Sequence, residues 1–127
     1  MKIGFIGTGN MGGALARAAA KSGEAELLLA NRTPEKAQAL ANAIGAAVCD
    51  NAAAAGEADH LFLGVKPQMM AGMLAGIAPV LKARAEKPVL ISMAAGLTIE
   101  SIRAMAGGAY PVIRIMPNMP AAVGEGV

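Results

Sequence analysis

The sequence predicts an α/β fold, a doubly wound and mainly parallel sheet of about six strands with helices on both faces. Two observations predict it. Short apolar runs alternate along the whole chain with longer Ala-rich stretches, an order typical of parallel strands joined by helices. Most of the apolar runs are continuous rather than alternating, as expected for strands that are covered on both faces.

The expected strands are the short apolar runs at residues 3–6, 26–30, 46–49, 60–65, 89–93 and 112–116. The stretches between them are dominated by Ala, Leu, Met, Lys and Glu, which favour helices. They predict helices at residues 11–22, 34–44, 51–55, 68–82 and 99–105. In the fourth of these helices we expect three methionines to lie in the core, namely Met69, Met70 and Met73.

Capping residues support these boundaries. Thr33 followed by Pro34 is typical of a helix start, because Thr caps the first turn and Pro suits its first position. Asp50 and Thr98 are expected to cap the third and fifth helices in the same way. Pro67 should open the fourth helix, since the residue before a proline avoids the helical region.

Length and composition exclude several function classes. A chain of 127 residues can form one domain, expected to span residues 1–127. A net charge of +2 without a Lys/Arg cluster, together with 2% aromatic residues, argues against nucleic-acid binding. The longest uncharged run, residues 67–81, is shorter than the ~18 apolar residues that a membrane span needs, so we expect a cytoplasmic protein. One cysteine, Cys49, and one histidine, His60, cannot form a tetrahedral metal site.

A glycine-rich loop follows the first expected strand and opens the first expected helix. It reads Gly7-Thr8-Gly9-Asn10-Met11-Gly12, a GxGxxG pattern. In such a loop the first glycine allows a tight turn, the second lets the backbone approach a pyrophosphate, and the third permits close packing of helix and strand. The amide groups at the helix N-terminus then face the phosphates. Because strand and helix flank it, the loop predicts a dinucleotide site and a Rossmann-type sheet.

The end of the second expected strand indicates which dinucleotide binds. An NAD site usually has a carboxylate here for the ribose 2′-hydroxyl, but the sequence reads Ala30-Asn31-Arg32-Thr33. Arg32 can pair with a 2′-phosphate, and Asn31 and Thr33 can add hydrogen bonds. The sequence therefore predicts NADP(H) in preference to NAD(H).

Four segments together give the chain a resemblance to a known family. They are residues 3–11 (IGFIGTGNM), 61–67 (LFLGVKP), 91–99 (ISMAAGLTI) and 114–118 (RIMPN). In this order they resemble the N-terminal cofactor-binding domain of pyrroline-5-carboxylate reductases, over essentially the whole chain. The resemblance implies reduction of 1-pyrroline-5-carboxylate to L-proline by NADPH, the last step of proline biosynthesis.

The resemblance also implies roles for individual residues. Ile6 to Met11 would line the pyrophosphate, and Asn31, Arg32 and Thr33 would take the adenosine phosphate. Asn51 would contact the cofactor, and the nicotinamide half would be bordered by Val65, Lys66, Pro67, Met93, Ala94 and Ala95. Pro117 and Asn118 would lie near the substrate, although Met119 stands where the family usually has Thr.

The family further implies a second, helical domain that forms a homo-oligomer and supplies most of the imino-acid pocket. The chain ends at Val127, where that domain should begin, so we expect a cofactor domain with little activity of its own. Two other functions stay open from the sequence. One is a β-hydroxyacid dehydrogenase-type NADP oxidoreductase, and the other is a non-catalytic NADP-binding module.

Overall fold

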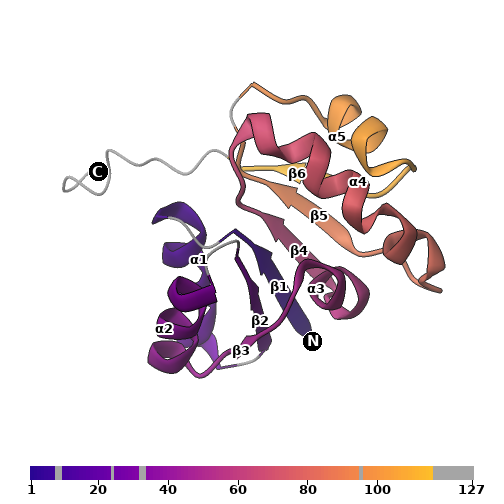
Figure 1. The fold of residues 1–127 in the computed structure, drawn as a ribbon. Coiled ribbons are helices and arrows are strands. Elements are labelled where there is room, and N and C mark those ends of the chain that lie inside the picture. The colour runs from indigo at the N-terminus through magenta and orange to yellow at the C-terminus, as the bar shows by residue number, and fades with distance from the viewer. Residues whose placement is uncertain (8–9, 24, 32–33, 95, 116–127) are drawn as a thin grey trace.

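A computed structural model describes residues 1–7, 10–23, 25–31, 34–94 and 96–115. Within these ranges, strands and helices alternate along the chain (Figure 1). The strands are β1 (Lys2–Ile6), β2 (Glu26–Ala30), β3 (Ala47–Val48), β4 (His60–Leu63), β5 (Val89–Ser92) and β6 (Val112–Arg114). The helices are α1 (Asn10–Ser22), α2 (Pro34–Ile44), α3 (Asn51–Glu57), α4 (Pro67–Ala83) and α5 (Ile99–Ala106).

The strands form one sheet in the order β3-β2-β1-β4-β5-β6, and every neighbouring pair is parallel. This order is that of the Rossmann fold, so the predicted fold class is confirmed. The order reverses between β1 and β4, where Ile6 pairs with Leu63 at the carboxyl ends of the two strands. The chain therefore leaves these two neighbouring strand ends in different directions.

Two hydrophobic clusters hold the layers together, one on each face of the sheet. Phe5 packs with residues of α1 and α2, such as Ala16 and Leu40, whereas Ile6 belongs to a cluster that includes residues of α3, α4 and α5. Adjacent residues of β1 thus serve opposite faces, as the two-residue period of a strand requires. Figure 1 shows the same division, with α1 and α2 on one side of the sheet and α3, α4 and α5 on the other.

Local capping places the helix starts as the sequence predicted. The Asp50 carboxylate accepts a hydrogen bond from the amide of Ala53 at 2.8 Å, and the Thr98 hydroxyl accepts one from Ser101 at 3.0 Å. Pro67 opens α4 after Lys66, whose backbone is extended. Thr33, the predicted cap of α2, lies outside the described residues.

Several predicted details are wrong. β6 ends at Arg114 rather than at residue 116, and α3 extends to Glu57 rather than ending at residue 55. β4 ends at Leu63 rather than at residue 65, because the chain must turn away from the sheet before Pro67 starts α4. Of the three methionines predicted in the core of α4, Met70 is fully buried and Met73 packs partly buried against the cluster, but Met69 is 38% exposed. Met69 precedes the buried position by one residue, which rotates it toward solvent.

The single histidine, His60, and the single cysteine, Cys49, lie at strand ends and pack within the fold. His60 begins β4, at the amino edge of the sheet, and its Nδ1 is buried without a hydrogen-bond partner among the described residues. Cys49 follows β3 and packs, partly buried, against the larger cluster. In the described part of the chain, no helix has the length and apolar character to cross a membrane.

Candidate functional site

The point where the strand order reverses brings two glycines together. Gly7 follows β1 with a φ of 90°, and its amide donates a hydrogen bond to the carbonyl of Ala30 at 2.8 Å. Gly64 follows β4, and its amide donates to the carbonyl of Ile6 at 2.7 Å. In open α/β sheets, ligands bind at the carboxyl ends of the strands at this reversal point.

The two glycines pack backbone against backbone. A Cβ atom added to Gly7 would lie 2.8 Å from both the carbonyl carbon and the oxygen of Gly64. A Cβ added to Gly64 would lie 2.6 Å from the Gly7 oxygen and 3.0 Å from the Cε of Met93. Neither position has room for a side chain unless the backbone shifts. The tight turn predicted at Gly7 is therefore part of a contact between two loops.

Gly64 is a site residue that the sequence reasoning missed. A glycine at the end of an apolar run was the available signal, because glycine in a strand often marks a close approach of backbone or ligand. Its partner, however, lies 57 residues earlier in the chain. Only the pairing of β1 with β4 shows that the two glycines meet.

The start of α1 provides a suitable environment for a phosphate. The helix begins at Asn10, three residues after Gly7, and its first turn contains no acidic residue. The first amides of a helix lack partners within the helix and carry partial positive charge, so they favour an anion. With the glycine contact beside it, this arrangement fits the pyrophosphate of a dinucleotide. Thr8 and Gly9 lie outside the described residues, as do the side chains of Asn10, Met11 and Gly12.

The predicted adenosine side lies at the ends of β2 and β3. Asn31 directly follows β2 and is half-buried. Asn51 opens α3 directly after Asp50, and β3 ends beside β2, where the amide of Cys49 donates to the carbonyl of Leu29 at 2.9 Å. Both asparagines therefore follow strands that end at the same edge of the sheet. Arg32 and Thr33 lie outside the described residues.

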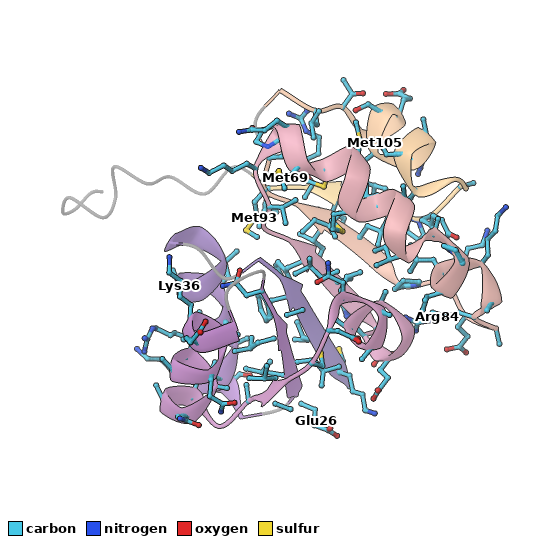
Figure 2. All side chains as sticks on the ribbon, in the orientation of Figure 1. Glu26, Lys36, Met69, Arg84, Met93 and Met105 are labelled. Carbon is cyan, nitrogen blue, oxygen red and sulfur yellow. The ribbon has the colours of Figure 1, made fainter. Side chains whose placement is uncertain are left out.

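The predicted nicotinamide side lies at the ends of β4 and β5. Lys66 is exposed between β4 and α4, and Val65 beside it is half-buried. Met93 and Ala94 follow β5 and are only 5% and 6% exposed. Figure 2 shows Met93 at this edge of the sheet, above the carboxyl end of β4. The described parts of the two segments are thus neighbours, while Ala95, Pro117 and Asn118 lie outside the described residues.

Among the described residues at this edge, shifted pKa values do not mark an acid–base catalyst. A hydrogen bond from the amide of Lys2 lowers the pKa of Asp59, but both residues lie at the opposite, amino edge. Burial raises the pKa of the Cys49 thiol, and the Asp50 charge adds to the effect, which disfavours a reactive thiolate. Among the described residues there is also no group of three or more potential metal ligands.

Comparisons with known proteins identify the family of the chain. Residues 2–96 match the model of a family described as NADP oxidoreductase coenzyme F420-dependent. A pyrroline-5-carboxylate reductase of Corynebacterium melassecola is 38% identical over 98% of this chain and 47% of its own length. The chain thus spans about half the length of the curated relatives it matches.

Solved structures show the same relationship. A pyrroline-5-carboxylate reductase from Coxiella burnetii superimposes with a TM-score of 0.85 at 30% identity, over 95% of this chain and 45% of that one. A Plasmodium falciparum pyrroline carboxylate reductase with NADP bound has a TM-score of 0.77 at 29% identity, over 98% and 45% of the two chains. The chain therefore belongs to the family described as NADP oxidoreductase coenzyme F420-dependent, and it corresponds to the N-terminal NADP-binding domain of pyrroline-5-carboxylate reductases.

Proposed function

We propose that this chain is the cofactor domain of an enzyme that reduces the C=N bond of 1-pyrroline-5-carboxylate to give L-proline. The observation that carries the proposal is the contact between Gly7 and Gly64 where the strand order reverses, directly before the N-terminus of α1. The curated relatives are named pyrroline-5-carboxylate reductases, and one of them matches over 98% of this chain and 47% of its own length, which supports the proposal.

The residues have distinct roles in holding the cofactor. The amides of the first turn of α1 would bind the pyrophosphate, and Gly7 keeps the loop clear of a side chain. Arg32, with Asn31 and Thr33, would bind the 2′-phosphate, and the lack of a carboxylate at this strand end favours NADP(H) over NAD(H). Asn51 would add a contact from the start of α3.

The segments after β4 and β5 would border the nicotinamide. When bound, NADPH supplies the hydride that the imine carbon accepts. Met93 and Ala94 are buried and apolar, so they keep water away from this side of the site. A protonated imine accepts hydride without a strong side-chain acid, which is consistent with a domain that contributes binding and orientation.

The remaining proposals concern what lies outside this domain. Pro117 and Asn118 are proposed to approach the substrate, and the imino-acid pocket and the homo-oligomer contact are assigned to the helical domain that the family carries. We place the enzyme in the cytoplasm, as expected for a step of amino-acid biosynthesis.

A titration followed by a turnover assay tests the function. NADPH and NADH are titrated into the chain, and NADPH oxidation is then followed with 1-pyrroline-5-carboxylate or with a β-keto acid. We expect NADPH to bind more tightly than NADH, and slow oxidation with the imine only. Faster oxidation with the β-keto acid would favour the dehydrogenase alternative. If neither nucleotide binds, the cofactor assignment is wrong.

A further inference from the structure

Ser92 is unusual among the described residues because its polar side chain is fully buried, with 1% exposed. It is the last residue of β5, where it pairs with Leu63 of β4 and Arg114 of β6. An alanine would fill nearly the same space without burying a hydroxyl group. Because burial of a hydroxyl group costs free energy unless the group is hydrogen-bonded, we expect this hydroxyl to make a contact that an apolar side chain could not make.

The hydroxyl holds the chain at the point where it leaves the sheet. Ser92 Oγ accepts a hydrogen bond from the amide of Ala94 at 3.2 Å, and the Ser92 carbonyl accepts one from the amide of Ile115 at 2.9 Å. Between them, the amide of Met93 donates to the carbonyl of Leu63 at 3.4 Å, which is longer than the usual range for an N–H···O hydrogen bond. Because Ala94 is buried, loss of the Ser92 bond would leave its amide without this acceptor.

The segment that Ser92 holds reaches the contact between the two glycines. The Cε of Met93 lies 3.0 Å from the position that a Cβ on Gly64 would occupy, and Gly64 in turn touches Gly7. The placement of Met93 therefore depends on how the chain turns after Ser92. A change in this turn would move the buried surface that Met93 and Ala94 present at the edge of the sheet.

We propose that Ser92 is a positioning residue that, through the amide of Ala94, holds Met93 and Ala94 in place against the nicotinamide half of the cofactor. This inference rests on the proposed function, since it assumes that the dinucleotide extends from α1 to the end of β5. It predicts that removal of the Ser92 hydroxyl lowers the affinity only for ligands that carry the nicotinamide. If the hydroxyl served only the stability of β5, its removal would not affect the binding of the two halves of the cofactor differently.

The test compares two ligands in the 127-residue chain. NADPH contains the nicotinamide, whereas 2′,5′-ADP carries only the adenosine half and its phosphates. In Ser92→Ala we expect the Kd of NADPH to rise about threefold to tenfold, the range that loss of one hydrogen bond gives. The Kd of 2′,5′-ADP should stay within about twofold, as expected for a site that is left intact. Ser92→Thr keeps the oxygen and should restore the wild-type ratio of the two constants.

A matched control and a second measurement separate positioning from folding. Ser22→Ala removes a hydroxyl that donates to the carbonyl of Ala19 at 2.8 Å, at the far end of α1, and should change neither constant. In Ser92→Ala, hydrogen exchange at the Ala94 amide should accelerate more than at the Met93 amide. If Ser92→Ala does not fold, Ser92→Cys must show the same split, because sulfur fills the space but accepts hydrogen bonds weakly.

The outcomes separate this inference from the proposed function. If wild type binds both ligands and Ser92→Ala weakens both equally or neither, the positioning role is wrong and the cofactor site stands. If wild type binds neither ligand, both the inference and the proposed function are wrong.

Discussion

Replacement of Gly7 by alanine tests the contact at the centre of the site. The φ of 90° at Gly7 is strained for any residue with a Cβ, at a cost of about 1–2 kcal/mol. The new Cβ would also lie 2.8 Å from two backbone atoms of Gly64, and such overpacking costs about 1–3 kcal/mol. We therefore expect the free energy of unfolding to fall by about 2–5 kcal/mol. Whole domains have a free energy of unfolding of about 5–15 kcal/mol. The expected loss does not exceed the lower end of that range, so a folded fraction should remain.

The same substitution should weaken cofactor binding. Relief of the clash moves the loop after β1 away from Gly64 by several tenths of an ångström, and this shift disturbs the amides that face the phosphates. We expect the Kd of NADPH to rise at least about tenfold, which corresponds to ~1.4 kcal/mol. Urea denaturation measures the first effect, and fluorescence titration of NADPH measures the second.

Gly45→Ala is the matched control for this experiment. Gly45 has a φ of 76° at the end of α2, but a Cβ there would meet no atom within 4 Å. It should therefore show only the backbone cost of about 1–2 kcal/mol and no change in NADPH affinity. If Gly7→Ala and Gly45→Ala lose the same stability and both keep NADPH affinity, the contact between Gly7 and Gly64 does not shape the site.

Three further substitutions and one control test other parts of the structure. Arg32→Asp should reverse the preference for NADPH over NADH, measured as the ratio of the two Kd values, and an unchanged ratio would remove Arg32 from the cofactor assignment. Arg84→Ala should lower the free energy of unfolding by about 1.5–3 kcal/mol in urea, because its guanidinium donates to two carbonyls at the end of α3 at 2.8 and 2.6 Å. Lys82 is exposed on the same part of the chain, and Lys82→Ala should change the free energy of unfolding by less than about 0.5 kcal/mol. If Lys82→Ala and Arg84→Ala lose the same stability, the hydrogen bonds of Arg84 do not stabilise the fold. The pKa of Asp59 lies below its ordinary 3.8 because its carboxylate accepts the amide of Lys2, so its contribution to stability is present above pH 3.8 and is lost as the pH falls below that value. The urea concentration at the unfolding midpoint should therefore fall less in Asp59→Asn than in wild type when the pH is lowered from neutral to about pH 3. An equal fall in both proteins would show that Asp59 contributes nothing.

Most of the fold could be predicted from the sequence because its signals are local. Continuous apolar runs identified the strands, and the observed strand ends lie within two residues of those predicted. The expected burial on both faces fails at the edges of the sheet, where both residues of β3 are exposed and β6 buries only Val112. Asp50, Thr98 and Pro67 marked helix starts through the chemistry of a single turn. The glycine-rich loop then indicated a Rossmann-type sheet, since its position between the first strand and helix is typical of that fold, and the observed strand order agrees.

The parts that could not be predicted depend on contacts between distant segments. Gly64 meets Gly7 at the candidate site only because β4 lies next to β1, and the bond from the Ala94 amide to Ser92 Oγ forms only because the chain turns at the end of β5. The exposure of Met69 depends on how α4 is rotated against the sheet, which an apolar helix does not reveal. The predicted roles of all the cofactor-site residues stay predictions, and Arg32, Thr33 and Asn118 also lie outside the described ranges.

An amide chemical-shift map during NADPH titration tests most directly where the cofactor binds. Gly7, Gly64 and Met93 report on the carboxyl edge of the sheet, and Lys2 and Asp59 report on the amino edge. We predict that the amides of the first three shift with NADPH, while those of Lys2 and Asp59 do not change. Shifts centred on the amino edge, or no shifts at Gly7 and Gly64 at saturating NADPH, would contradict a cofactor site at the reversal of the strand order.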